Sequence, residues 1–449
     1  MNASRLRRIL GLGFCLAFVF GTMVGVGILR LPGMVAAAVG SPFLVMVCWC
    51  VGGLYALMGA VSVSELAAAY PEAGGLRVFA RHAFGEGAGF VVGWVDWLAS
   101  VATLAYGAVA AVQFLGTLWP LLGQYESAAA SALLILFALM HLVGVRIGSS
   151  AITGVSAATG ILLMVLIGAC LLTHPVVQAT TSAGAGLHST STAPAGTLLA
   201  MVPAIRALLT AYDGWYAPVY TAEESLDCSR TLPRAIIGGA LMVVGLYLLI
   251  NYAFLCVLPI PVLAASTLPA ASAADAVLPH GSGALMTALS ILIALNLING
   301  NIIMGPRVLF SMAREGWIAG GLAAVNTGGT PHAALIATAV TSIVMVLTGS
   351  FNQLIALFAV LILLNYVVTF ASVFALRRRK PDLPRPYRAL GYPLSTGVVL
   401  AGSLSFLVVA LIEDWRSGLT AVLFLSLCLP AYALAARSRR TRAAAYAPS

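Results

Sequence analysis

The feature that most constrains the fold is a series of long apolar segments without charge, repeated from one end of the chain to the other. Segments such as 161–172 and 398–412 contain no Lys, Arg, Asp or Glu. Such segments are long enough, with their flanks, to cross about 30 Å of hydrocarbon as helices. A transmembrane barrel would show weakly alternating segments of about 10 residues instead. We therefore predict an all-α polytopic membrane protein.

Composition excludes the soluble and disordered classes. Hydrophobic residues make up 61% of the chain and charged residues 8%, whereas soluble domains carry about 25% charge. So little charge could not cover a soluble surface or keep a chain disordered. The net charge of +9 comes from arginines between apolar segments, which indicates membrane topology rather than nucleic-acid binding. The seven cysteines show no metal-ligand spacing, and we expect no metal and no cofactor.

We predict twelve transmembrane helices within a single transport domain, residues 1–449. The predicted spans are 9–37, 42–68, 88–116, 127–143, 150–172, 197–221, 235–258, 283–309, 333–349, 352–375, 394–412 and 418–435. The first is longer than the apolar core of a signal peptide, so we interpret it as an uncleaved span.

The positive residues predict the orientation. If the N-terminus is cytoplasmic, all but three of the 23 lysines and arginines fall in cytoplasmic segments, the exceptions being Arg30, Arg206 and Arg416. This asymmetry predicts that both termini are cytoplasmic in a multi-pass protein of a cell membrane. The single lysine and the many alanines suggest a bacterial inner membrane.

Two of the spans are interrupted. The first carries Gly21, Gly25 and Gly27, and the sixth carries Asp213 beside Gly214. Glycine weakens a helix by about 1 kcal/mol relative to Ala, and breaks at matching positions of two halves indicate a binding site at a repeat interface. Breaks five spans apart predict a five-plus-five inverted repeat, with halves 9–172 and 197–375 and two additional helices in 394–435. The alternative for the first glycine run is close helix packing.

A broken membrane helix offers N–H groups to an anion and carbonyls to a cation. An amino-acid zwitterion carries both charges, so we expect the first break to bind its carboxylate and the second its ammonium. Asn296 and Asn299 share one helix face and either line the cavity or bond neighbouring helices. The candidate substrate-binding residues are Thr22, Met23, Val24, Gly25, Val26, Gly27, Ala211, Tyr212, Asp213, Gly214, Trp215, Asn296 and Asn299.

Charged residues inside membrane spans are functional candidates. Asp213 is either a proton or substrate-amine partner or a polar cap on the broken helix. We predict that Arg30 or Arg206 approaches Asp213, although either could instead attract a substrate carboxylate. Glu65 either pairs with a cytoplasmic arginine at an inner gate or ends its helix in solvent, and Asp96 is interpreted as structural. The candidate gating and coupling residues are Arg30, Glu65, Thr159, Arg206, Thr210 and Asp213.

Several motifs resemble one membrane-protein family. Gly25-Val26-Gly27-Ile28-Leu29 resembles the Gly-Ser-Gly-Ile-Phe break of the amino acid–polyamine–organocation (APC) superfamily of permeases. Ala211–Trp215, with Glu223-Glu224 and Leu232–Ile236, looks like the sixth span and following loop of the L-type amino acid transporter branch. Further agreement lies in 65–75, 299–316 and 377–393. The resemblance implies the inverted-repeat fold and alternating access.

The chain also departs from the family pattern. Val26 stands where relatives usually carry Ser or Thr, Thr210 where many carry an aromatic gate, and Thr159 where many carry a Lys. A sodium-like site at Thr159 is therefore conceivable, whereas the lysine's role is not carried over. The segment 117–130 has no Cys, so we expect no disulfide-linked accessory subunit.

The sequence thus predicts a secondary active transporter, a symporter or exchanger of neutral L-amino acids, with a proton as one option for the coupling ion. One alternative is a non-transporting amino-acid sensor of the same fold; another is a polyamine or cationic amino acid antiporter. The chain has no nucleophile–base pair and no phosphate-binding Gly-rich loop, which argues against an enzyme or an ATP-driven pump.

Overall fold

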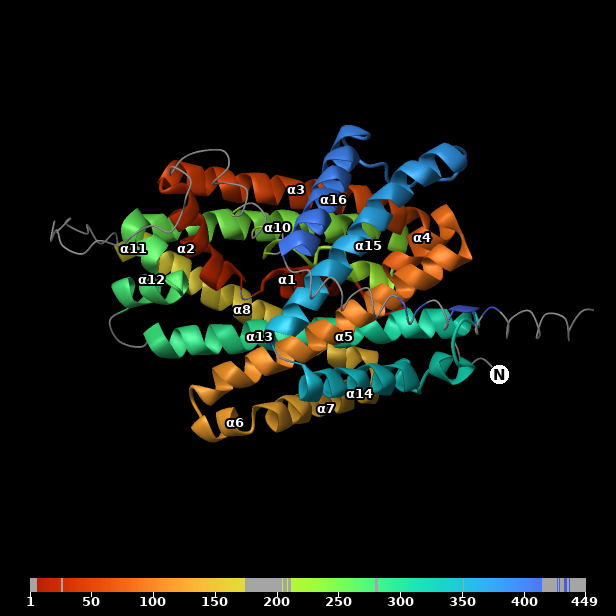
Figure 1. Cartoon of the computed structure of the whole chain (residues 1–449), viewed down its shortest axis with the longest axis horizontal. Helices are drawn as coiled ribbons and strands as arrows, with labels where there is room; N and C mark the ends of the chain where they lie inside the picture. Colours follow the sequence, from red (N-terminus) through yellow and green to blue (C-terminus); the bar gives the residue numbers. More distant parts are fainter. Residues whose placement is uncertain are drawn as a thin grey trace, which may run out of the picture.

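The protein is a helical bundle (Figure 1). The computed structural model describes residues 6–25, 27–173, 204, 208, 211–278, 282–349 and 351–413, together with 426, 428, 432, 433 and 436. Within these residues the structure has no strand, only an isolated parallel bridge between Leu10 and Ser225. The all-α prediction is confirmed for this part of the chain.

The long helices match the apolar segments of the sequence. They are α1 Leu12–Met23, α2 Gly27–Val39, α3 Pro42–Ala69, α5 Glu86–Gly116, α7 Glu126–Val143, α8 Val145–Thr173, α10 Cys228–Val257, α13 Ser282–Arg314, α14 His332–Thr348, α15 Phe351–Arg379 and α16 Leu394–Glu413. The short helices are α4 Leu76–Phe84, α6 Pro120–Gln124, α11 Ile260–Ala265, α12 Pro269–Val277, and the 3₁₀ helices η1 Ala217–Glu224 and η2 Gly320–Ala323.

Eight helices in the described part are long and apolar enough to cross a membrane, and the bent pair α1–α2 makes a ninth candidate. Helix α14 is apolar but shorter. Most of the predicted span 418–435 and most of the sixth span before residue 211 lie outside the described residues. The chain is therefore a multi-pass membrane protein, and the full set of twelve spans stays a prediction.

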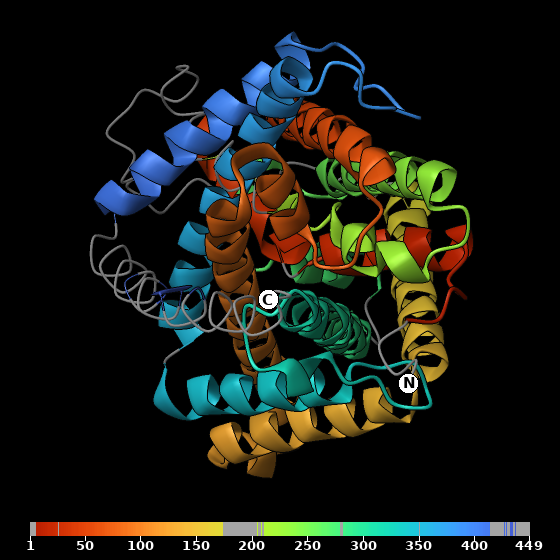
Figure 2. The ribbon, with the colours of Figure 1, turned by 90° about the vertical axis from the view of Figure 1, so that its right-hand side faces the viewer.

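Helices α5 and α13 form the centre of the bundle. In their most apolar 18-residue windows, 78% of α5 and 72% of α13 is buried inside the protein, against 22% for α7 and α16. Figure 2 shows α13 in the interior, with α7 and α14 along one edge and α16 along the opposite edge. Helices at the edges present leucines and isoleucines to the lipid, as a helix in hydrocarbon can.

Both predicted breaks are present in the backbone. Helix α1 ends at Met23 and α2 begins at Gly27, with a bend of 47° between them. The sixth span leaves helical geometry at residues 212–216, where Gly214 has φ +107°, and continues as η1. The segment after the break is a 3₁₀ helix rather than an α-helix, and it runs slightly beyond the predicted end of the span at 221. Gly21 lies inside α1, where a Cβ would come within 2.6 Å of Ser156 Oγ, so this glycine serves helix packing.

The segment before α1 and the segment after η1 are joined through their backbones. The N–H groups of Ile9 and Leu10 donate to Glu224 O at 3.0 and 2.9 Å, and Leu226 N donates to Leu10 O at 2.8 Å. These bonds form the bridge between Leu10 and Ser225. The start of the first broken span and the end of the second are thus hydrogen-bonded to each other at one end of the bundle.

Candidate functional site

The two helix breaks meet in the middle of the bundle. Thr22 Oγ1 lies 2.9 Å from the carbonyl oxygen of Gly214. A Cβ on Gly214 would lie 2.6 Å from Thr22 O, and one on Gly27 would lie 3.5 Å from Ala211 Cβ. Segments almost two hundred residues apart are therefore in backbone contact, which brings together the two sets of residues that the sequence analysis proposed.

Several residues at the breaks are partly exposed, although the surrounding residues are buried. Thr22, Gly25, Gly27 and Asp213 keep some accessible surface. Among the described residues, the nearest heavy atom to a Cβ built on Gly25 is Met23 O, at 4.0 Å. The breaks thus border open space next to unwound backbone, which is where membrane proteins accept irregular structure. Val26 lies outside the described residues.

Other candidate residues support the breaks from behind. Tyr212 is buried and its hydroxyl donates to Trp49 O at 3.2 Å. Trp215 stacks on Tyr366 with ring centroids 5.7 Å apart. Met23, Val24 and Ala211 are buried as well, and Met23 O accepts a hydrogen bond from Tyr247 at 2.9 Å. These side chains hold the unwound segments in place. The residues would therefore contact a ligand through their backbone groups.

The described contacts of Asp213 are with tyrosines, and the predicted approach of Arg206 stays a prediction because Arg206 lies outside the described residues. Its Oδ1 accepts a hydrogen bond from the Tyr366 hydroxyl, and Oδ2 lies 3.4 Å from the Tyr216 hydroxyl. In the described part of the chain the side-chain partners of this carboxylate are tyrosines, not arginines. Arg30 is exposed on α2, and Arg206 and Thr210 lie outside the described residues. A tyrosine in an apolar span gives no sequence signal, which is why Tyr366 was missed.

The two asparagines of α13 bond neighbouring helices. Asn296 Nδ2 donates to Thr159 Oγ1 at 3.2 Å, so Thr159 belongs to a contact between α13 and α8. Asn299 Oδ1 lies 2.6 Å from His141 Nε2 on α7. The α13 residue that faces the first break is Gly300, where a Cβ would lie 2.6 Å from Thr22 Cγ2. This geometry favours the prediction that the two asparagines bond neighbouring helices over the prediction that they line the cavity.

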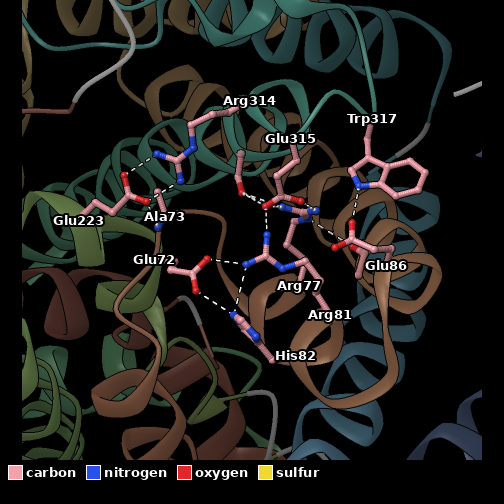
Figure 3. A network of polar contacts seen from close by, with 12 residues as sticks. Glu72, Ala73, Arg77, Arg81, His82, Glu86, Glu223, Arg314, Glu315 and Trp317 are labelled. Carbon is pink, nitrogen blue, oxygen red and sulfur yellow. Dashed lines mark hydrogen bonds and ion pairs between the residues drawn. The ribbon is translucent and has the colours of Figure 1, made fainter. Parts of the chain in front are cut away.

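An ion network covers the arginine-rich end of the bundle, predicted to be cytoplasmic (Figure 3). Arg77 on α4 is fully buried and donates to Glu315 at the end of α13, with Nη1–Oε1 3.0 Å and Nη2–Oε2 2.6 Å. Arg81, one turn further along α4, also contacts Glu315 and pairs with Glu72 at 2.5 Å. The network therefore fastens α4 and the loop before it to α13.

Further pairs extend the closure of this end. Arg314 pairs with Glu223 at 2.5 Å, and Glu223 also accepts the backbone N–H of Ala73 at 2.9 Å (Figure 3). Glu224, beside it in η1, forms a buried pair with Arg307 of α13, with Nε–Oε1 2.5 Å. Because η1 directly follows the second break, these pairs fix the position of that break relative to α13.

Glu65 pairs with arginines, which was one of the two alternatives predicted for it. This buried carboxylate lies 2.5 Å from Arg377 and 3.2 Å from Arg385, and accepts the Ala389 N–H at 2.7 Å. It joins the end of α3 to α15 and to the loop after it. The helix α4 and the partners of Arg77 and Arg81 were missed, although arginines one turn apart were a visible signal of a short amphipathic helix.

Glu72 makes part of this closure dependent on pH. The hydrogen bond from His82, together with Arg81, lowers the pKa of Glu72 from 4.5 to about 2 despite partial burial. Its stabilising contribution is therefore complete above the unfolded pKa of about 4.5 and is lost as pH falls toward 2. Its side chain is 35% exposed, so solvent screening leaves about 1 kcal/mol.

We expect Glu72→Gln to lower the unfolding free energy at pH 7 by about 1 kcal/mol, and the difference from the wild type to shrink between pH 5 and pH 2. Thermal unfolding in detergent across this range measures both. Asp382→Asn, which changes an exposed carboxylate at the same end, is the matched control and should change nothing. A difference that does not depend on pH would contradict the assignment.

The amino acid permease family model matches residues 11–429. The serine/threonine exchanger SteT of Bacillus subtilis (strain 168) is 27% identical over 440 residues, covering 95% of this chain and 96% of that protein. The human large neutral amino acids transporter small subunit 2 is 28% identical, covering 85% of this chain and 72% of its own. The mouse b(0,+)-type amino acid transporter 1 is 26% identical, and the match covers 91% of this chain and 84% of that protein.

Proposed function

The chain belongs to the amino acid permease family, and we propose that it is a secondary transporter of neutral L-amino acids that works by alternating access. The observation that carries this proposal is the meeting of two unwound segments beside open space at Thr22, Gly25, Gly27 and Asp213. The ion network at the arginine-rich end of the bundle supplies a set of contacts that can close one side of such a site.

The first break supplies groups for a carboxylate. Helix α2 begins at Gly27, so the N–H groups of its first turn have no partner within the helix and point toward the break, an arrangement that favours anions. Gly25 leaves space in front of these groups. Residues 211–213 precede Gly214, whose carbonyl oxygen contacts Thr22 of the first break, and we expect their carbonyls to accept the ammonium. The twin charges of an amino-acid backbone fit these two sets of groups.

The state of Asp213 favours a neutral substrate side chain. Both carboxylate oxygens already accept tyrosine hydroxyls, so neither is held free for a cationic side chain or a polyamine. SteT is named as a serine/threonine exchanger and a second relative as a transporter of large neutral amino acids. These names support neutral amino acids as the substrate class.

Counterflow measures this function directly. We expect purified protein in liposomes loaded with unlabelled serine to take up labelled serine, and neutral amino acids to compete more strongly than arginine, lysine or putrescine. Stronger competition by the cationic compounds would favour the antiporter alternative. Binding of serine without any counterflow would favour a sensor.

Filling the open space at the first break tests the site itself. We expect Gly25→Leu to reduce serine counterflow at least ten-fold, because the side chain would occupy the region in front of the α2 N-terminus. Gly245→Leu is the control, since Gly245 on α10 also has nothing within 4 Å of a Cβ but lies away from the breaks. Equal counterflow by the two variants would place the substrate elsewhere.

A further inference from the structure

A second acidic residue, Asp96, lies between the helix breaks and the ion network. It sits on α5 with 2% of its surface exposed, and the Tyr220 hydroxyl donates to its Oδ1 at 2.6 Å. Within the described residues Asp96 forms no ion pair; its carboxylate accepts hydrogen bonds from this neutral tyrosine and from the backbone N–H of Leu76. The role proposed for it here rests on the transport function proposed above.

The charges around Asp96 are balanced without it. Arg77 acts on Asp96 electrostatically, and its side chain packs against α5 at Gly93, three residues before Asp96, where a Cβ would lie 2.8 Å from Arg77 Cδ. The guanidinium of Arg77, however, already donates to both oxygens of Glu315. Arg81 contacts Glu315 and Glu72 in turn, so two arginines face two glutamates. A charged Asp96 would be a surplus negative charge in the interior of a membrane protein, which is unfavourable, whereas a protonated Asp96 would not.

Two tyrosines connect Asp96 to Asp213. Tyr216 and Tyr220 are four residues apart, and their ring centroids are 6.1 Å apart. The Tyr216 hydroxyl faces Asp213, and the Tyr220 hydroxyl faces Asp96. Tyr366 from α15 also donates to Asp213, and Tyr106 from α5 lies close enough to interact with it electrostatically. The series therefore runs from a partly exposed carboxylate at the breaks to a buried carboxylate beside the ion network.

We propose that Asp96 carries a proton during transport and exchanges it with Asp213 along Tyr216 and Tyr220. Asp213 takes up the proton from water at the open breaks. Its O–H then breaks as the proton passes to the Tyr216 oxygen. Tyr216 gives its own hydroxyl proton to a bridging water, and that water gives one of its protons to the Tyr220 oxygen. The original hydroxyl proton of Tyr220 forms the new O–H on Asp96. Both tyrosines end as neutral phenols, and one proton has moved. Release from Asp96 toward the arginine-rich end completes the passage of one proton with the substrate.

The test uses purified full-length protein in liposomes that contain the pH indicator pyranine, with serine as the probe. We expect an inward proton gradient to drive serine accumulation in the wild type, and serine influx to acidify the lumen. Asp96→Asn should lower gradient-driven accumulation at least ten-fold relative to its own counterflow and remove the acidification. Asp96→Glu, which restores a titratable group, should recover part of both. Asp227→Asn alters an exposed carboxylate outside this series and is the control.

The outcomes separate this inference from the proposed function. If the wild type shows no serine counterflow, the proposed function is wrong. If it shows counterflow but moves no protons, or if Asp96→Asn accumulates serine and acidifies the lumen like the wild type, the proton role of Asp96 is wrong and the transport function stands. If Asp96→Asn and Tyr220→Phe lose counterflow and accumulation in equal proportion, the pair is a structural anchor and the proposal is likewise overturned.

Discussion

Gly214→Ala is expected to abolish counterflow and to lower the unfolding free energy by about 2–3 kcal/mol. The residue has φ +107°, a region that costs L-residues about 1–3 kcal/mol. A methyl group there would also lie 2.6 Å from the carbonyl oxygen and 2.7 Å from the carbonyl carbon of Thr22. Backbone atoms cannot rotate aside as a side chain can, so the two breaks would have to separate. Thermal unfolding in detergent and serine counterflow measure the two effects.

Gly168→Ala provides the control for this prediction. Gly168 lies in α8 and has nothing within 4 Å of a Cβ, so the substitution should leave counterflow unchanged and stabilise the helix by about 0.5–1 kcal/mol. Wild-type counterflow by Gly214→Ala would mean that close contact between the breaks is not needed for transport.

Glu224→Gln is expected to destabilise the protein by about 3–5 kcal/mol, because it leaves Arg307 charged and unpaired in the interior. The side chains of this pair are 0% and 4% exposed. The pair also connects η1 to α13, so we expect lower yield of monodisperse protein. Size-exclusion chromatography and thermal unfolding measure the loss.

Two further variants identify the cause. The double variant Glu224→Leu with Arg307→Met removes both charges, and replacing a buried pair by apolar groups is often nearly neutral. We therefore expect it to recover most of the stability lost by Glu224→Gln. Asp227→Asn disrupts the exposed pair with Arg230, whose atoms are 3.9 Å apart, and should cost no more than about 1 kcal/mol. A double variant as unstable as the single one would show that the hydrogen-bond geometry, rather than the unpaired charge, matters.

The sequence predicted the elements whose length is set by the membrane. Helices α3, α7 and α16 begin and end within about two residues of the predicted spans, because the thickness of hydrocarbon fixes how many apolar residues a span needs. The two breaks were also predictable, since glycines and an ionisable residue in an apolar segment are visible in the sequence alone.

The side-chain partners were harder to predict. Asp213 and Tyr366 are 153 positions apart, and no local pattern indicates that they meet. The two arginines near the breaks were interpreted as counter-ions of Asp213 because an isolated charge in a membrane needs a partner, yet tyrosine hydroxyls meet that need without a charge. The short helix α4 was missed because it lies beside the membrane spans rather than among them, so the length of an apolar segment could not reveal it.

The backbone bridge between Leu10 and Ser225 has a mechanical consequence. Its hydrogen bonds use main-chain groups only, so substituting side chains does not weaken them, except where proline removes an N–H. The ends of the two broken spans are therefore expected to move as one lever whenever this end of the bundle opens, with the flexing confined to the unwound residues at the breaks. Slow amide hydrogen exchange at Leu10 and Leu226 in both open and closed states would be the signature of such a lever.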